Sequence, residues 1–204
     1  MAKGRVSKED WTMAALRAFS RGGVSAVAVD VLARELAVSR GSFYWHFENR
    51  DALIVAALET WELHATTEVI TASDAHEDPW TRARSLFLAA LGDEEIAGLE
   101  PALGAARDTH PAVADVVDRV TRTRIAYLGS IFADLGFAPE DARHRALAAY
   151  AAYLGWLDLR RTAPAIAPET LPGTPAAEAA LDHVIAMLGT LPRPEGTAGG
   201  GATD

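Results

Sequence analysis

The chain has 204 residues, half of them hydrophobic, and carries a formal net charge of −9. This length fits one large domain or a small domain joined to a larger one, with enough apolar side chains for a sizeable core. The absence of cysteine excludes a disulfide framework, a thiolate nucleophile and a Cys-ligated zinc site.

Neither a secretory signal nor a membrane span is expected. The N-terminal stretch MAKGRVSKEDW contains no continuous apolar run. No window approaches the roughly 18 apolar residues that a transmembrane helix requires. We therefore expect a cytoplasmic protein that does not associate with a membrane.

The charge is distributed unevenly along the chain. Residues 1–50 hold eight Lys or Arg and five Asp or Glu, a net charge of +3, which leaves −12 for the other 154 residues. This asymmetry suggests a nucleic-acid-binding end on an acidic body, although +3 by itself is as well explained by chance.

The N-terminal residues predict short helices with clear boundaries. Ser7 and Asp10 have the spacing of a capping box, and Gly22-Gly23 should end the helix that they open. A second short helix has apolar residues at one-turn spacing from Val29 to Leu36, and Ser39 is placed to cap a third.

The rest of the chain also reads as helical. Asn49 can cap a long helix, Pro79, Pro111 and Pro139 can each open one, and Gly136 can end one. The predicted ranges are 50–73, 79–91, 94–108, 111–135, 139–162 and 175–190. No strand alternation occurs, so the fold class is all-α with about nine helices.

Three regions follow from this layout. Residues 1–49 should form a three-helix helix-turn-helix head, and residues 50–191 a helical bundle. Residues 192–204, rich in Gly and Pro, have the composition of a disordered tail.

The third predicted helix carries an unusual run of aromatic residues, FYWHF, at 43–47. Phe43 and Phe47 are one turn apart and should face the core of the head. Arg40 and Tyr44 share another face, which suits the major groove of DNA, where residues near a helix N-terminus reach base edges. Gly41 costs helix stability of about 1 kcal/mol relative to Ala, which close approach to DNA would explain; the alternative is a loosened first turn.

The stretch LARELAVSRGSFYWHFENRDALI resembles the DNA-binding signature of the tetracycline-repressor (TetR) family of bacterial regulators. Its elements agree with the family pattern in order, type and spacing over about residues 7–55. Two positions depart from it: Ala37 stands where the family usually has glycine in the turn, and Val27-Ala28 where it tends to place capping threonines. Ser25 is the nearest substitute for them.

The resemblance implies which residues face DNA. Arg50 and the start of its helix would meet a phosphate, and the N-terminal arm would add nonspecific contacts. His46 and Trp45 have purely structural alternatives. The expected DNA-binding residues are Arg40, Gly41, Ser42, Tyr44, Trp45, His46, Arg50, Lys3 and Arg5.

The family's body dimerises and holds a small molecule, and this sequence is consistent with both roles. The last two long helices, rich in alanine, suit a four-helix interface between two copies, the alternative being the core of one copy. The expected interface residues are Leu154, Leu157, Leu181, Val184, Ile185 and Leu188. The expected ligand-binding residues are Trp61, Phe87, Tyr127, Phe132, Tyr150 and Trp156, each of which could instead belong to an ordinary core.

Polar groups give little further chemistry. Arg122 and Arg124, in a mostly apolar helix, are candidates to anchor a ligand's acid group or are simply exposed to solvent. The histidines lack metal-ligand spacing, so neither a metal nor a cofactor is expected. No nucleophile motif, phosphate loop or paired-carboxylate constellation points to an enzyme.

The sequence therefore predicts a ligand-responsive transcriptional regulator, most simply a repressor. It would bind a palindromic double-stranded DNA operator as a homodimer and be released by a small, largely apolar effector. A small-molecule enzyme and a helical adaptor using the same cavity remain as alternatives.

Overall fold

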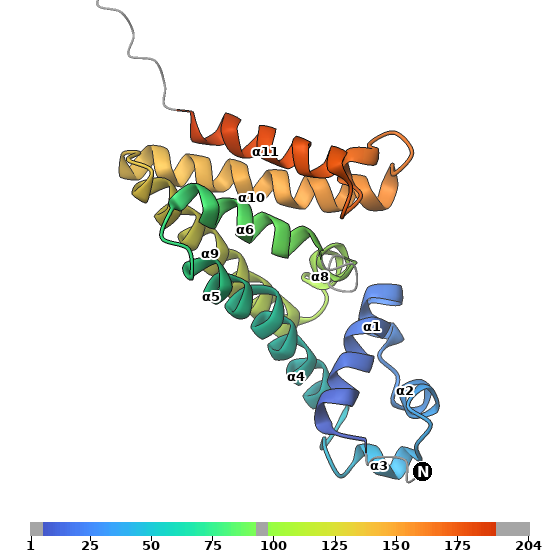
Figure 1. Cartoon of the computed structure of the whole chain (residues 1–204). Helices are drawn as coiled ribbons and strands as arrows, with labels where there is room; N and C mark the ends of the chain where they lie inside the picture. The colour runs from blue at the N-terminus through green and yellow to red at the C-terminus, as the bar shows by residue number, and fades with distance from the viewer. Residues whose placement is uncertain (1–5, 93–97, 191–204) are drawn as a thin grey trace, which may run out of the picture.

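The computed structural model describes residues 6–92 and 98–190, and every regular element in these ranges is helical. A small head, formed by α1, α2 and α3, lies at one end of an elongated helical body (Figure 1). The elements are α1 (Lys8–Ala26), α2 (Val29–Glu35), α3 (Arg40–Phe43), α4 (Arg50–Glu62), a π-helical turn (Leu63–Thr67), α5 (Glu68–Asp74), α6 (Pro79–Gly92), α8 (Leu99–Ala106), α9 (Pro111–Asp134), α10 (Pro139–Thr162), a 3₁₀ turn (Pro168–Thr170) and α11 (Pro175–Gly189).

This architecture confirms the all-α prediction. With α4, the π-helical turn and α5 taken as one continuous rod, the described residues hold nine helices. None of these helices is long and apolar enough to cross a membrane. The predicted arm residues Lys3 and Arg5, and the predicted tail at 192–204, lie outside the described residues.

Two of the three predicted helix caps form. The Ser7 hydroxyl accepts from the Asp10 amide at 3.1 Å and the Asp10 carboxylate accepts from the Ser7 amide at 2.7 Å, which completes the capping box. The Asn49 side chain accepts from the Ala52 amide at 2.9 Å. The cap predicted at Ser39 is wrong, since its side chain makes no capping hydrogen bond to α3.

Glycines interrupt the helices where the sequence predicts. Gly23 has a φ of +67° and separates the long part of α1 from one last turn, and Gly136, with a φ of +92°, follows the end of α9. The amide of Phe137 then bonds back to the carbonyl of Phe132 at 3.2 Å, which satisfies one of the last carbonyls of α9.

Ala37 adopts the left-handed conformation that the family's glycine would adopt freely. Its φ of +55° makes it the one non-glycine residue with positive φ among the described residues. The amide of Val38 bonds to the carbonyl of Ala33 at 2.9 Å, so the turn closes α2 as a glycine turn would. The turn therefore keeps its shape, and Ala37 carries the strain.

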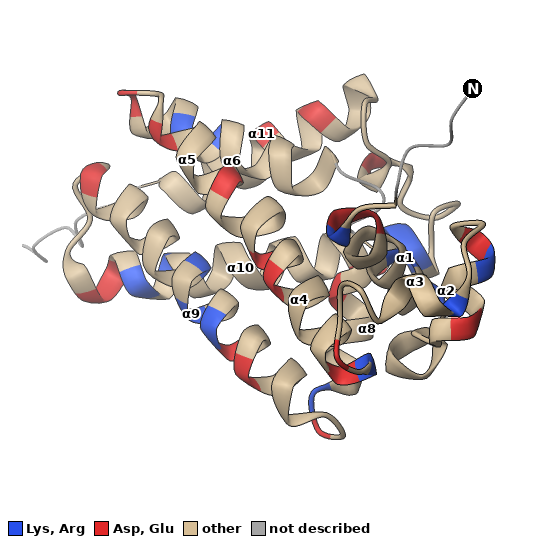
Figure 2. Cartoon of the chain, turned by 90° about the horizontal axis from the view of Figure 1, so that it is seen from below, with Lys and Arg blue, Asp and Glu red and all other residues tan. Residues whose placement is uncertain are grey.

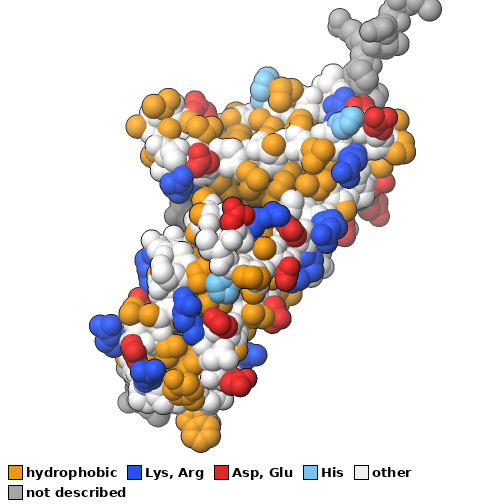
Figure 3. All heavy atoms as spheres, turned by 180° about the vertical axis from the view of Figure 1, so that it is seen from behind, with side chains coloured by type: hydrophobic (Ala, Val, Ile, Leu, Met, Phe, Trp, Pro, Cys, Tyr) orange, Lys and Arg blue, Asp and Glu red, His pale blue; other side chains and the backbone are white. Residues whose placement is uncertain are grey.

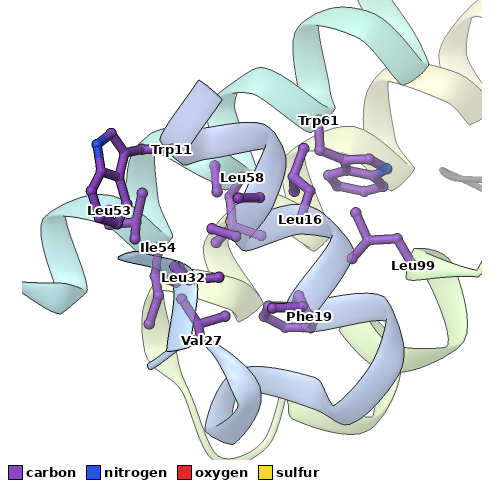
Figure 4. Close-up of a cluster of buried hydrophobic side chains, with 14 of the residues drawn as sticks. Trp11, Leu16, Phe19, Val27, Leu32, Leu53, Ile54, Leu58, Trp61 and Leu99 are labelled. Atoms are coloured by element: carbon purple, nitrogen blue, oxygen red, sulfur yellow. The ribbon is translucent and has the colours of Figure 1, made fainter. Parts of the chain in front are cut away.

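The described residues form two clusters of buried hydrophobic side chains, one at the head and one in the body. The cluster at the head is shown in Figure 4 and is built around α1, α2 and α4. Its largest fully buried side chains are Trp11, Val27, Leu32, Phe43, Leu53, Ile54, Leu58, Trp61, Leu99, Leu103 and Val113. The second cluster joins α6, the end of α9, α10 and α11.

The head core does not end at the predicted domain boundary between residues 49 and 50. It includes Trp61 from the end of α4, Leu99 and Leu103 from α8, and Val113 from α9. Helix α8 packs against α1, so the body contributes one wall of the head. The head and body are therefore distinct in shape but continuous in packing.

We expect Ala37→Gly to stabilise the protein by about 0.5–1 kcal/mol, because glycine removes the left-handed strain at the turn. Urea unfolding would measure the change as a higher midpoint with an unchanged slope. Ala126→Gly, on the exposed face of α9, is the matched control and should destabilise by about 1 kcal/mol. Destabilisation by both substitutions would contradict strain at Ala37.

Candidate DNA-binding surface and ligand cavity

The aromatic run at 43–47 is divided between the core and the solvent. Phe43 and Phe47 are 1% and 5% exposed, and their rings stack with centroids 5.6 Å apart. The edge of Trp11 on α1 meets Phe43 at 5.4 Å. This agrees with the prediction that these two phenylalanines hold the recognition segment to the head.

The regular part of α3 is shorter than the predicted helix. It spans four residues, and the backbone continues as turns in which Phe47 donates to the carbonyl of Phe43 at 3.0 Å. Within these turns Trp45 is 80% exposed and Tyr44 is 55% exposed. The Tyr44 ring meets that of Phe43 with centroids 5.2 Å apart, but most of both aromatic side chains faces solvent. Exposed apolar surface of this kind is typical of a site that binds another molecule.

Arg40 lies on the same surface as Tyr44. Its guanidinium donates to the Tyr44 hydroxyl at 3.5 Å and is 3.5 Å from the Asp30 carboxylate of α2. Tyr44 and then Asp30 raise the pKa of Arg40 above its ordinary value. Arg40 is thus a permanently charged, exposed donor, loosely held by partners that a phosphate or base edge could replace.

The remaining predicted DNA contacts have mixed environments. A Cβ on Gly41 would meet the Ser39 hydroxyl at 3.7 Å, an ordinary contact, so nothing in the described part of the chain requires glycine there. Gly41 is exposed, whereas Ser42 and His46 are half-buried. The His46 ring lies 6.5 Å from that of Phe47, which fits a packing role as well as a DNA contact.

Arg50, which the sequence predicts to meet a phosphate, also makes hydrogen bonds within the head. Its Nε donates to the Val27 carbonyl at 2.7 Å, and its Nη2 donates to the Val24 carbonyl. The guanidinium therefore ties the start of α4 to the last turn of α1. Nη1 is 4.0 Å from the Asp51 carboxylate and the side chain is 38% exposed, so this geometry gives Arg50 a structural role and leaves Nη1 accessible.

The other charges of the head are largely paired within it. Arg21 bonds to Glu35 of α2 at 2.9 Å, and the view from below shows acidic and basic residues side by side on the head helices (Figure 2). Ser25 donates to the Gly22 carbonyl at 3.1 Å, so it does not replace the missing threonine cap of α2. The head is therefore a mixed rather than uniformly basic surface.

A small cavity lies in the body between the π-helical turn, α5, α6, α9 and α10. Its volume is about 40 Å³, room for a few water molecules and well below the several hundred Å³ of a typical ligand site. Its lining is mostly hydrocarbon and aromatic, consisting of Ala65, Thr66, Val69, Ile70, Leu86, Phe87, Ala90, Arg124, Tyr127, Leu128, Tyr150 and Tyr153.

Three of the six predicted ligand-binding residues line this cavity: Phe87, Tyr127 and Tyr150. The other three do not. Trp61 belongs to the head core, Phe132 packs against Phe137 with ring centroids 6.1 Å apart, and the Trp156 indole donates to the Thr170 carbonyl at 3.3 Å. All three lie on the expected helices but on faces that turn toward other neighbours.

Arg124 and Tyr153 also line the cavity, and they meet a buried acid. The Arg124 guanidinium bonds to the Glu100 carboxylate at 2.5 Å, with side chains 12% and 8% exposed, and the Tyr153 hydroxyl donates to the same carboxylate at 3.3 Å. Burial alone would lower the pKa of Arg124, but the charge of Glu100 raises it above its ordinary value. Burial, with Glu100 beside it, also raises the pKa of Tyr153.

Only one partner of this ion pair, Arg124, is indicated by the sequence. Arg124 was a candidate anchor for an acid group, whereas its neighbour Arg122 is exposed. Its partner Glu100 could not be identified from spacing, because 24 residues separate the two. Within the described ranges, no group of three or more His, Asp or Glu side chains is arranged to hold a metal ion.

The predicted interface residues on α10 and α11 also divide between core and surface. Leu157, Leu181 and Ile185 are buried within the chain's own second cluster, so for them the alternative interpretation holds. Leu154 is 39% exposed, and Val184 and Leu188 are half-buried.

Apolar side chains nevertheless remain exposed on each of these two helices. On α10 it contains Leu147, Ala151 and Leu154, at one-turn spacing. On α11 it contains Ala176 and Met187, of which Met187 is 60% exposed. Exposed hydrophobic side chains are visible over the upper part of the body in Figure 3. We refer to these five residues as the α10/α11 face.

Residues 12–57, which contain the helix-turn-helix, match the family of bacterial regulatory proteins described as the tetR family. The regulator TtgR of Pseudomonas putida is 37% identical over 65 residues, and the regulator AcrR of Shigella flexneri is 43% identical over 49 residues. These alignments cover 32% and 24% of this chain, and only 30% and 21% of the relatives. The relatives are transcriptional regulators, not enzymes.

Solved structures share the fold over nearly the whole chain. A transcriptional regulator from Rhodococcus sp. Rha1 superposes with a TM-score of 0.74 at 23% identity, over 92% of this chain and all of the other. A TetR regulator from Legionella pneumophila gives 0.71 at 16% identity, over 92% and 98%. The multidrug binding protein EbrR, complexed with imidazole, gives 0.58 at 24% identity, over 91% and 96%. Residues 12–57 therefore match the TetR family of bacterial regulatory proteins, and the described chain as a whole shares the fold of these solved structures.

Proposed function

We propose that this chain is a transcriptional repressor that binds a palindromic operator as a homodimer and is released when a small, largely apolar molecule enters the body. The observation that carries the DNA-binding part is the surface of α3. There Arg40, Tyr44 and Trp45 are exposed together on a segment whose other face is locked into the core by Phe43 and Phe47.

The chemistry of this surface suits duplex DNA. An arginine near a helix N-terminus can bond to a guanine edge or to phosphate, and tyrosine and tryptophan can cover sugar and thymine methyl groups. Arg40 makes only long, solvent-exposed contacts with Asp30 and Tyr44. DNA can therefore replace these contacts at little cost in free energy. An adaptor that binds proteins would not need a charged group at this position.

A dimer follows from the size of the head. One segment of this length contacts only a few base pairs, whereas two heads related by a two-fold axis read two half-sites about 34 Å apart. The α10/α11 face supports pairing through these helices, because it leaves large apolar side chains uncovered in one copy.

The cavity supports the effector. It lies among helices that connect to the head, it is aromatic, and its volume of about 40 Å³ is that of a closed state which a ligand would have to open. EbrR, a protein of the same fold, is a multidrug binding protein solved with imidazole. A ligand that favours the opened body over the DNA-bound one would lower operator affinity by that difference in free energy.

The DNA surface is tested by titrating the pure protein against promoter fragments flanking its own gene, at several salt concentrations. We expect a preferred palindrome and a steep fall of affinity with salt. Arg40→Ala and Tyr44→Ala should each weaken this binding by about 10-fold or more, because they remove groups facing the groove. Arg122→Ala, at an exposed position of α9, is the matched control. The proposal fails if no fragment is bound even at low salt.

Arg50 should behave differently from Arg40. Because Arg50 bonds to the carbonyls of Val24 and Val27, Arg50→Ala should lower the melting temperature as well as DNA affinity. Arg40→Ala, which removes exposed contacts only, should leave the melting temperature within about 1 °C. An unchanged melting temperature in Arg50→Ala would instead support a direct phosphate contact.

The dimer is tested on the α10/α11 face. We expect Leu154→Glu, and independently Leu147→Glu, to shift the protein toward a monomer, since each places a charge in an apolar contact. Light scattering coupled to size exclusion would measure the mass. Val55→Glu, a similarly exposed apolar position on α4, should leave the mass unchanged. Retention of the dimer in both α10 variants would exclude this face.

A further inference from the structure

The cavity in the body contains a single charge among its described lining residues, the guanidinium of Arg124. Every other lining side chain is aliphatic, aromatic or hydroxylic. Nε of Arg124 donates to the Thr66 hydroxyl at 3.0 Å, Nη1 to the Glu100 carboxylate at 2.5 Å, and Nη2 to the Ala65 carbonyl at 2.9 Å. Glu100 does not line the cavity, so Arg124 stands between the cavity and its acid partner.

The bonds to Ala65 and Thr66 explain how Arg124 stays in place without Glu100. Both acceptors belong to the π-helical turn, an irregularity often found at functional sites, which here presents a backbone carbonyl to the guanidinium. The guanidinium also lies over the rings of Trp61 and Tyr153, at 5.3 and 5.7 Å from their centroids. These contacts hold the Arg124 guanidinium in place, so among its partners the Glu100 carboxylate is the one that another carboxylate can replace.

Glu100 sits on the helix that joins the cavity to the head. Helix α8 has only eight residues, and Leu99, Leu103 and Ala106 bury its other side in the head core. Figure 4 shows Leu99 grouped with Leu16 of α1 and with Trp61. The Glu100–Arg124 pair therefore holds α8 next to the cavity. Because α8 also packs against α1, the pair links the cavity to the head.

We propose that the effector is an apolar aromatic or alkyl molecule bearing one carboxylate, which replaces Glu100 on Arg124 and so releases α8. This inference rests on the proposed function and specifies the ligand class and the route to the head. The exchange conserves charge, because one carboxylate leaves the guanidinium as another arrives. The displaced Glu100 must regain water, which requires α8 to move.

Other ligand charges fit this site less well. A cation entering the cavity would meet Arg124 before Glu100 and would be repelled. An uncharged molecule would find the pair already satisfied and would have no reason to open it. The stacked rings of Tyr150 and Tyr153, with centroids 6.0 Å apart, and the side chain of Phe87 provide the surface for the apolar part.

The test is calorimetric titration of the full chain with two matched series of probes. One series is 2-naphthoate, 2-naphthalenemethanol and 2-naphthylmethylammonium; the other is decanoate, decanol and decylammonium. We expect the carboxylate of at least one series to bind 10-fold or more tightly than its alcohol and its ammonium. The proposal is overturned if neither carboxylate shows this preference.

Single substitutions test whether the Glu100–Arg124 pair causes the tighter binding of the carboxylate. Arg124→Met should reduce the preference for the carboxylate to less than about threefold, whereas Arg122→Met, an exposed arginine of the same helix, should leave it unchanged. Glu100→Gln should tighten carboxylate binding by about 10-fold, because the internal competitor is gone. Should either single variant fail to fold, the double variant Glu100→Gln/Arg124→Met, which leaves no unpaired charge, must show no preference.

The release of α8 has a readout that does not involve DNA. Amide hydrogen exchange in Leu99–Ala106 should become faster when the carboxylate binds the wild-type protein, and should not respond to it in Glu100→Gln. Unchanged exchange in the wild type at saturation would overturn the release. Failure to bind promoter fragments without ligand would refute the proposed function and leave these measurements standing.

Discussion

Leu99 and Leu103 of α8 are buried in the head core, where α8 packs against α1, and this packing joins the head to the body. A helix of eight residues has little stability of its own, so α8 is held by what it touches. On one side it touches the core that supports the recognition segment. On the other it presents Glu100 to Arg124 beside the cavity. Any change in the cavity that moves α8 must therefore disturb the wall of the head.

The recognition segment depends on the same core. Four residues of regular helix would not persist alone, and Phe43 and Phe47 fix the segment by burying their rings against Trp11 and its neighbours. Each such burial is worth about 1.5–3 kcal/mol, enough to hold Trp45 and Tyr44 outward in water. The exposed aromatics are consistent with a surface that DNA covers. Arg50, bonded to two carbonyls of α1, fixes the angle at which this unit joins α4.

The buried ion pair between Glu100 and Arg124 is not explained by stability alone. Removing one partner of such a pair typically destabilises a protein by about 3–5 kcal/mol, while an apolar replacement of both is often neutral. Stability alone would thus be as well served by two apolar residues at 100 and 124. A charge that faces an otherwise apolar cavity, and whose partner lies on the helix leading to the head, is better explained as part of a switch.

The sequence by itself determined the local structure and the chemistry of the head. Capping residues, glycines and prolines act within a few residues of where they stand, so Ser7, Asn49 and Gly136 could be assigned without a fold. Only the tertiary structure decided which face of each body helix meets which neighbour. Trp61 and Trp156 turned away from the cavity, Leu157 and Ile185 turned into the chain's own core, and Arg124 met Glu100. Helical periodicity predicts which face of a helix a residue occupies. It does not predict which other helix packs against that face, because this depends on contacts between segments far apart in the chain.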